Sequence, residues 1–78
     1  MKKISVVIPC WSEEKSIRLM YDRLKNVFDC QLSNYDYEII FVDDHSPDNT
    51  WGEIEKVCTI DKKVKGISGE RKPNSDIP

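Results

Sequence analysis

Two short polar clusters contain the side chains in this sequence that could do chemistry. The first occupies residues 9–14 and reads Pro9-Cys10-Trp11-Ser12-Glu13-Glu14, and the second occupies residues 43–50 and begins with Asp43 and Asp44. The first cluster offers an aromatic ring on which a base or sugar could stack, beside the start of a predicted helix whose positive end favours phosphate. In the second cluster, Asp44 could accept hydrogen bonds from the N–H edge of a nucleobase, while Asp43 turns toward backbone amides of the following loop.

Both clusters also have a purely structural interpretation. Ser12 could cap the first helix, Glu13 could interact with the helix dipole, and Trp11 could cover the edge of the core. Asp43 and Asp48 could likewise act as caps in a turn that leads into a second helix. Two adjacent carboxylates after an apolar strand repel each other, however, and a ligand donor or a metal ion would relieve that repulsion.

The histidine and the cysteines receive no chemical role. His45 is a lone loop histidine, for which solvation is the simplest interpretation. Cys10 has no histidine within sequence reach to activate it, so we expect it to pack against the core. With Cys30 and Cys58 the cysteines are odd in number and widely spaced, which indicates reduced thiols and neither a disulfide framework nor a zinc site.

The hydrophobic pattern predicts an α/β protein with the order β-α-β-α-β. A strand over residues 4–8 ends at Pro9 and, being nearly continuous in β-branched residues, should be covered on both faces. A helix then extends to about residue 29, and a buried strand covers residues 37–42. A short helix includes residues 51–58, and a weaker strand covers residues 63–67.

The connections are long enough for helices, which favours a Rossmann-like parallel sheet with right-handed crossovers. In such a sheet, ligands bind beyond the carboxyl ends of the strands, where both polar clusters fall. We therefore expect the two clusters to face each other across one crevice. Residues 1–67 should form one partial domain, and residues 68–78 a disordered tail.

Composition excludes several classes of function. The 78 residues are 33% charged and 38% hydrophobic, with a net charge of -2, which is typical of a small folded domain. No basic stripe is present, so nucleic acid is not an expected partner. The apolar run before Pro9 is too short for a signal peptide or a membrane span, so we expect no direct membrane insertion and a cytoplasmic location.

The two polar clusters and the strands before them resemble those of a known family. The segment Val7-Ile8-Pro9-Cys10-Trp11-Ser12-Glu13-Glu14 is similar to the V-I-P-x-Y-N-E-E opening of family 2 glycosyltransferases, and residues 43–50 look like their D-D-x-S-x-D-x-T motif. Residues 37–42 also match. The Ser46-Pro47-Asp48 variant most resembles the branch that makes dolichol-phosphate mannose or undecaprenyl-phosphate sugars, and the resemblance extends over residues 1 to about 71.

The resemblance implies the N-terminal, nucleotide-binding part of a GT-A fold. Such enzymes transfer a sugar with inversion from a nucleotide diphosphate sugar to an acceptor such as a polyprenyl phosphate or a glycan, as in cell envelope polysaccharide biosynthesis. By resemblance, the nucleotide pocket would be lined by Pro9, Trp11, Glu13, Val42 and Asp44. Trp11 keeps the aromatic face of the family's usual Tyr, whereas Ser12 replaces the usual Asn and shortens any hydrogen bond that the amide made.

Two functional parts of the family are not found in the sequence. The family holds Mg or Mn with a D-x-D motif on a later strand, and the general base also comes from a later segment. No such motif follows residue 71, and Asp36-Tyr37-Glu38 precedes the second strand and would lie at the opposite end of the sheet. We therefore expect a truncated fragment that is inactive alone, with no catalytic residue and no metal bound by this chain itself. The complete protein would work in the cytoplasm or at the cytoplasmic face of the membrane.

Three alternatives remain open. A dinucleotide-binding module would also be β-α-β, but residues 9–14 lack the G-x-G-x-x-G turn. A receiver-like signalling domain would use clustered aspartates, but a later strand-end Asp or Lys is missing. A non-catalytic remnant could instead associate with itself or with another chain through an exposed sheet edge.

Overall fold

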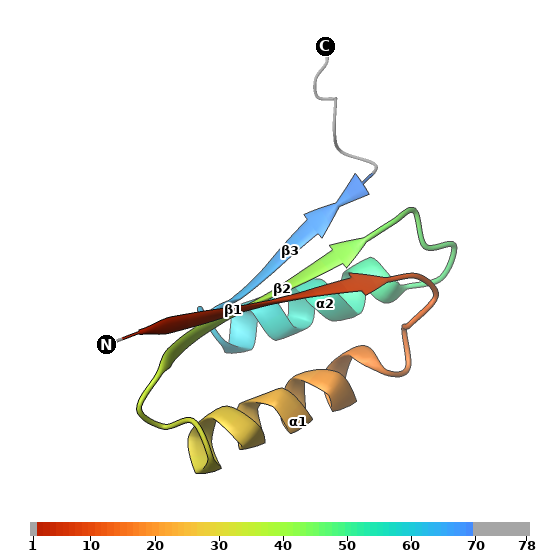
Figure 1. Ribbon diagram of the computed structural model, residues 1–78. Helices are drawn as coiled ribbons and strands as arrows, with labels where there is room; N and C mark the ends of the chain where they lie inside the picture. The colour runs from red at the N-terminus through yellow and green to blue at the C-terminus, as the bar shows by residue number, and fades with distance from the viewer. Residues whose placement is uncertain (1, 70–78) are drawn as a thin grey trace.

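The predicted order of elements is confirmed by the computed structural model, which describes residues 2–69 (Figure 1). The elements are β1 (Lys3–Cys10), α1 (Ile17–Cys30), β2 (Asp36–Asp43), α2 (Thr50–Ile60) and β3 (Val64–Ser68). The strands form one parallel sheet in the order β1-β2-β3. This is the Rossmann-like arrangement that the sequence predicted. The predicted tail lies, from residue 70 on, outside the described residues.

The strands β1 and β3 each extend slightly further than predicted. β3 continues through Ser68, and β1 continues through Pro9 to Cys10. Pro9 is tolerated because β1 lies at the edge of the sheet. The carbonyls of Lys2 and Cys10 both accept hydrogen bonds from the β2 side, so the backbone groups of the odd-numbered residues between them point to the free edge. The missing N–H of Pro9 therefore removes no bond within the sheet.

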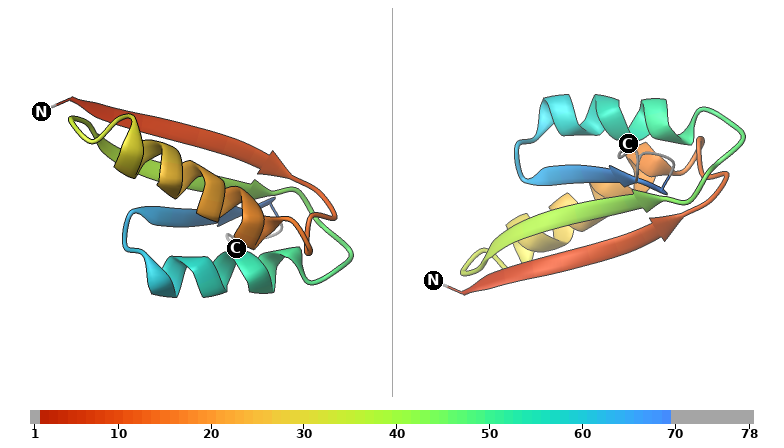
Figure 2. Two further views of the ribbon diagram at one scale, coloured as in Figure 1. Left: turned by 90° about the horizontal axis from the view of Figure 1, so that it is seen from below. Right: turned by 90° about the horizontal axis from the view of Figure 1, so that it is seen from above.

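Both helices cover the same face of the sheet (Figure 2). Because the chain steps from β1 to β2 to β3 in one direction, two right-handed crossovers place α1 and α2 on one side. On that side Ile39 and Phe41 of β2 are fully buried, whereas Val7 of β1, on the other side, is 60% exposed. The prediction that the first strand is covered on both faces is therefore wrong for the described part of the chain.

Helix α1 begins later than the capping pattern predicted. Its N-cap is Ser16, and the amides of Ser16 and Ile17 donate to the carbonyl of Glu13 in the turn before the helix. Ser12 lies outside the helix with a φ of 54°, so its predicted role as helix cap is wrong. The apolar face of α1 buries residues at helical spacing against the sheet: Ile17, Tyr21 and Phe28.

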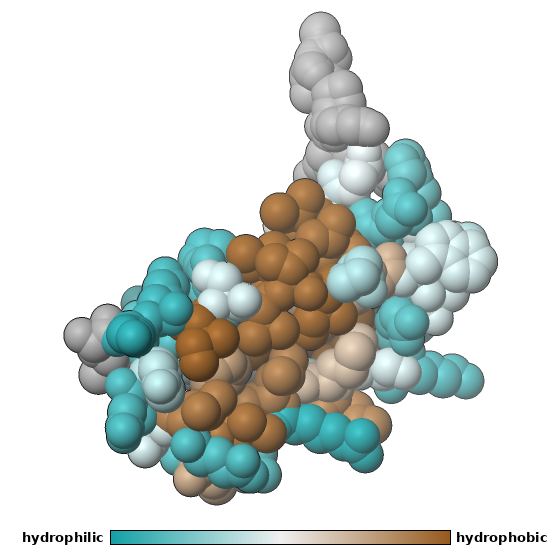
Figure 3. Space-filling view, in the orientation of Figure 1, coloured by the Kyte–Doolittle hydropathy of each residue, from teal (hydrophilic) through white to brown (hydrophobic). Residues whose placement is uncertain are grey.

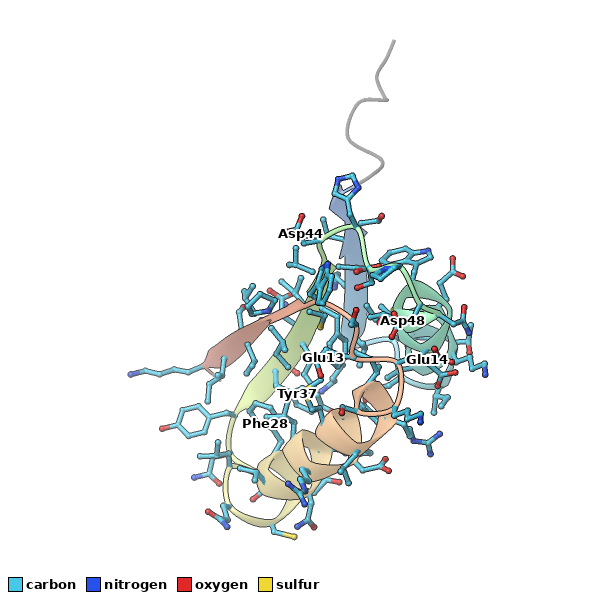
Figure 4. All side chains as sticks on the ribbon, turned by 90° about the vertical axis from the view of Figure 1, so that its right-hand side faces the viewer. Glu13, Glu14, Phe28, Tyr37, Asp44 and Asp48 are labelled. Carbon is cyan, nitrogen blue, oxygen red and sulfur yellow. The ribbon has the colours of Figure 1, made fainter. Side chains whose placement is uncertain are left out.

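A polar network joins the elements at the amino end of β2. The hydroxyls of Tyr21 and Tyr37 donate to the same carboxylate oxygen of Asp61, at 2.8 and 3.0 Å. The ring of Phe28 stacks on Tyr37 with centroids 4.4 Å apart, and both lie over α1 in Figure 4. The backbone N–H of Lys63 donates to the other Asp61 oxygen at 2.9 Å. These contacts hold α1, β2 and the turn before β3 together at the end opposite the two polar clusters.

Candidate functional site

The two polar clusters meet at the carboxyl ends of β1 and β2. Cys10 and Asp43 are register partners, and the amide of Asp44 donates to the carbonyl of Cys10 at 3.1 Å. The loops that follow, residues 11–16 and 44–49, lie at the same end of the sheet (Figures 1 and 2). The expected shared location beyond the strand ends is therefore present.

The structure distributes the predicted nucleotide-lining residues over this end of the sheet. Pro9 and Val42 are register partners whose side chains lie on the face without helices. Trp11 follows on the first loop and is 60% exposed, so it does not cover the core edge as the structural interpretation supposed. Asp44 is exposed after β2, and Glu13 is half-buried in the loop before α1. Two apolar side chains, an aromatic ring and an exposed carboxylate thus lie at the carboxyl ends of β1 and β2.

The adjacent carboxylates Asp43 and Asp44 have different environments. Asp43 is 4% exposed and accepts a hydrogen bond from the amide of Ser46 at 3.1 Å, so it has the turn-stabilising role that was predicted for one of the pair. Asp44 directly follows β2 and is exposed. Gly69, after β3, brings its backbone close to Asp44: a Cβ atom there would lie 3.6 Å from its Oδ1.

Cys10 is the buried thiol beside the site. Burial, together with the nearby charges of Glu13 and Asp43, raises the pKa of its thiol to about 11. Because the thiolate is the nucleophile, this thiol is unreactive near neutral pH, which agrees with the predicted packing role.

Four polar residues connect the two loops, a role that sequence reasoning did not assign to them. Their side chains bond backbone amides of the opposite loop, and they are Glu14, Ser46, Asp48 and Thr50. In Figure 4, Glu14 and Asp48 lie next to each other where the loops meet. The signal in the sequence was the alternation of short polar side chains at positions 46, 48 and 50, within the second motif.

The described residues do not fit a divalent cation. No three His, Cys, Asp or Glu side chains between residues 2 and 69 gather as a ligand group. Asp36 lies at the far end of β2, where it accepts from Lys63 at 2.6 Å, and this bond holds the pKa of its carboxyl below the usual range. Glu38 similarly accepts from Ser5 at 2.7 Å. That this chain alone binds no metal stays a prediction.

An apolar groove lies away from the strand-end site. Its volume is about 360 Å³, and it runs between β1 and α1, lined by Val6, Ile8, Met20, Arg23 and Leu24. None of the predicted nucleotide-lining residues borders it. No helix within residues 2–69 has the length and apolar character needed to cross a bilayer.

A parallel β-α-β-α-β sheet with polar loops at its strand ends defines the class of Rossmann-like α/β proteins, in which ligands bind beyond the carboxyl ends of the strands. The sequence model of glycosyl transferase family 2 matches residues 5–73, and the chain belongs to that family. The match includes both motifs and all five predicted nucleotide-lining residues.

Relatives with assigned names support the same family. The chain is 37% identical to CsbB of Bacillus subtilis, a glycosyltransferase by name, over 87% of this chain and 20% of that protein. It is 36% identical to the dolichol-phosphate mannosyltransferase of Pyrococcus furiosus over 73% of this chain and 15% of the relative. It is also 36% identical to the undecaprenyl-phosphate 4-deoxy-4-formamido-L-arabinose transferase of Proteus mirabilis, over 78% of this chain and 18% of the relative. The chain thus spans a fifth or less of the length of these relatives.

Proposed function

We propose that residues 2–69 form the donor-nucleotide part of an inverting glycosyltransferase that uses a nucleotide diphosphate sugar. The observation that carries the proposal is the difference between the adjacent carboxylates at the end of β2. Asp43 is buried and bonded to the amide of Ser46, whereas Asp44 is exposed beside the loop that bears Trp11. A carboxylate acceptor and an exposed aromatic ring are the groups that recognise the edge and the face of a nucleobase.

Four of the five predicted residues have a binding role in this proposal. The ring of Trp11 stacks against the base, and the Asp44 carboxylate accepts its N–H groups. Pro9 and Val42 provide the apolar floor beneath the nucleoside, while Glu13 lies in the turn whose backbone leads into α1. None of these residues is assigned to the chemical step.

Sugar transfer itself is proposed for a longer polypeptide. We propose that the general base and the carboxylates for Mg or Mn lie outside residues 2–69, and that this chain alone is inactive. When bound, the cation would offset the charge of the departing diphosphate. Two of the relatives are named for transfer to dolichol phosphate or undecaprenyl phosphate. We therefore propose a polyprenyl phosphate or a glycan as acceptor, and a location in the cytoplasm or at the cytoplasmic face of the membrane.

The proposal is tested by titrating the chain with UDP, GDP and their sugar conjugates, with and without Mg or Mn. Trp11 fluorescence reports binding once Trp51 is replaced by Phe. We expect saturable quenching by one nucleotide. The variant Asp44→Ala should raise the dissociation constant about tenfold or more, because a hydrogen bond to a charged group contributes roughly 1.5–3 kcal/mol.

The matched control for Asp44→Ala is Asp22→Ala. This change removes an exposed carboxylate, on α1, that is paired with Arg18. It should leave nucleotide affinity unchanged. An equal loss of nucleotide affinity in both variants would indicate a general charge effect. If no nucleotide changes the Trp11 fluorescence of the folded parent chain, the proposal is overturned.

A second candidate function is self-association through the free edge of β1. It is favoured by the backbone groups of the odd-numbered β1 residues, which face away from β2, and by the apolar groove beside them. Two antiparallel β1 edges would form one continuous sheet with both α1 helices on the same face. The walls of the two grooves, which include Met20 and Leu24, would then face each other.

A further inference from the structure

Three successive backbone amides of the first loop donate to three alternating side chains of the second polar cluster, residues 43–50. The amide of Ser12 donates to Ser46 Oγ at 2.9 Å, and that of Glu13 donates to Thr50 Oγ1 at 2.9 Å. The amide of Glu14 donates to Asp48 Oδ2 at 3.3 Å. One bond runs in the reverse direction, from the amide of Asn49 to Glu14 Oε1 at 3.1 Å.

The three acceptors are themselves held in place. Thr50 is completely buried, and both its amide and its hydroxyl donate to Asp48 Oδ1. Because Asp48 Oδ2 already accepts from the first loop, both oxygens of this carboxylate are engaged within the protein. The amide of Ser46 is bound by the buried carboxylate of Asp43. Two of the supporting residues, Asp43 and Thr50, are buried, whereas Asp48 is exposed.

The bonded segment includes a strained residue next to the aromatic ring. Ser12 has a φ of 54°, which residues other than glycine rarely adopt. Its amide is the one bound by Ser46, and it directly follows Trp11 in the chain. A backbone conformation of this kind persists when surrounding contacts fix it. The backbone directly after Trp11 is therefore bonded to the second loop.

We propose that Ser46, Asp48 and Thr50 are positioning residues: they hold the backbone of residues 12–14 and thereby orient Trp11 relative to Asp44, without touching the ligand. The inference deepens the proposed function and rests on it for its consequence in nucleotide binding. A loop fixed before binding loses less conformational freedom when the ligand arrives, which increases affinity. In this chain the second motif thus supplies one ligand-facing carboxylate and three side chains that shape the first loop.

The test compares Thr50→Val with Thr50→Ser, both with Trp51 replaced by Phe. Val keeps the shape of Thr but removes the acceptor, whereas Ser keeps the hydroxyl. We expect Thr50→Val to accelerate hydrogen exchange at the Glu13 amide, to increase acrylamide quenching of Trp11, and to raise the nucleotide dissociation constant about tenfold. Thr50→Ser should restore all three readouts toward those of the parent.

The matched control is Thr59→Val in the same helix, where the hydroxyl bonds only the carbonyl of Lys56 within α2. It should change none of the three readouts. Ser46→Ala provides a second variant at a less buried position, with the Ser12 amide as its exchange reporter.

The outcomes separate this inference from the proposed function. Unchanged amide exchange and unchanged quenching in Thr50→Val and Ser46→Ala would overturn the inference even if the parent binds nucleotide. Faster exchange without weaker binding would also overturn it, because the loop would then not matter for the ligand. Absence of nucleotide binding by the parent would overturn the proposed function, while exchange and Trp11 quenching would still decide whether the three side chains orient the loop.

Discussion

Ser12 shows how a single backbone conformation shapes the candidate site. Ser12 and His45, one in each site loop, are the residues other than glycine between positions 2 and 69 that have a positive φ, 54° and 57°. The glycosyltransferase family to which the chain belongs usually has Asn at the position of Ser12. Asn adopts left-handed backbone conformations more readily than most residues, which gives a physical reason for that preference. The difference between Ser and Asn at this position therefore concerns the backbone as well as the side chain.

The strain at Ser12 predicts that glycine is tolerated better there than at a neighbouring serine. Ser12→Gly should raise the free energy of unfolding by up to about 1 kcal/mol, because relief of the left-handed strain exceeds the added flexibility of the unfolded chain. The control is Ser16→Gly, at the N-cap of α1 with a φ of -107°, which should lower the free energy of unfolding by roughly a few tenths of a kcal/mol. Urea unfolding measures both, and the same sign of change in the two variants would contradict the prediction.

At the scale of the elements, Asp61 connects parts of the chain that are distant in sequence. Burial raises the pKa of its carboxyl, but hydrogen bonds from the Lys63 amide and from the hydroxyls of Tyr21 and Tyr37 outweigh burial and hold the pKa below the usual range. The same hydrogen bonds raise the pKa of each tyrosine hydroxyl. Burial and the bond to Asp61 raise the pKa of Tyr21 and that of Tyr37.

Asp61→Ala should lower the free energy of unfolding by about 1–3 kcal/mol at neutral pH, because two mostly buried hydroxyls lose their acceptor. A carboxyl whose pKa is lowered by folding stabilises the fold above its unfolded pKa, about 4, and this contribution is lost as the pH falls through the folded value. The difference in the free energy of unfolding between the parent and Asp61→Ala should therefore become smaller at acidic pH, as measured by urea unfolding at several pH values. Asp22→Ala, which removes an exposed ion pair, is the control and should change stability by less than about 1 kcal/mol.

The contact between α2 and β3 requires a glycine in the strand. A Cβ atom on Gly66 would lie 2.7 Å from Ile54 Cγ2 and 3.1 Å from the ring of Trp51. Gly66→Ala should therefore lower the free energy of unfolding by about 1–3 kcal/mol through overpacking.

The control for Gly66→Ala is Gly52→Ala in α2. There the added Cβ atom meets the side chain of Asn49, which is exposed and can rotate away. The gain in helix propensity, up to about 1 kcal/mol, should then leave stability unchanged or higher. Thermal unfolding of both variants decides the prediction, and equal destabilisation would show that the packing of β3 against α2 does not require glycine.

At the scale of the whole molecule, one side of the sheet has no covering layer among residues 2–69. Figure 3 shows a broad apolar surface around the β1 edge, which is the side turned to the viewer in the orientation of Figure 1. The exposed large apolar residues on the uncovered face of the sheet include Val7 and Ile67, near the carboxyl half of the strands. The amino half of this face is polar, because Glu38 bonds Ser5 and pairs with lysines on both neighbouring strands. The apolar half is thus continuous with the candidate site and with the free β1 edge.

This surface predicts self-association that depends on β1. The average mass from sedimentation equilibrium should increase with protein concentration, and Val7→Lys should reduce the increase, since a charge beside an edge strand opposes pairing. Val27→Lys makes the same change at an exposed position on α1 and should leave association unchanged. A monomeric mass at every concentration would contradict the prediction.

The sequence by itself determined the order of elements and the position of both polar clusters after strands. Strand and helix patterns are local, so the spacing of apolar residues was enough to predict β-α-β-α-β and to place both clusters after strands. The family could be identified for the same reason, because its motifs are short contiguous segments at these strand ends.

Only the tertiary structure decided which face of the sheet is uncovered and how the loops are held. A continuous run of β-branched residues predicts a strand that is covered on both faces. The direction of both crossovers, however, puts α1 and α2 on the same side of the sheet. Ser12 looked like a helix cap, yet its amide donates to Ser46, which is 34 residues away in the chain. The Thr50 bond to the Glu13 amide spans 37 residues. Such bonds form only when folding brings the ends of β1 and β2 together, so the alternation of polar residues at positions 46, 48 and 50 could not by itself identify their partners.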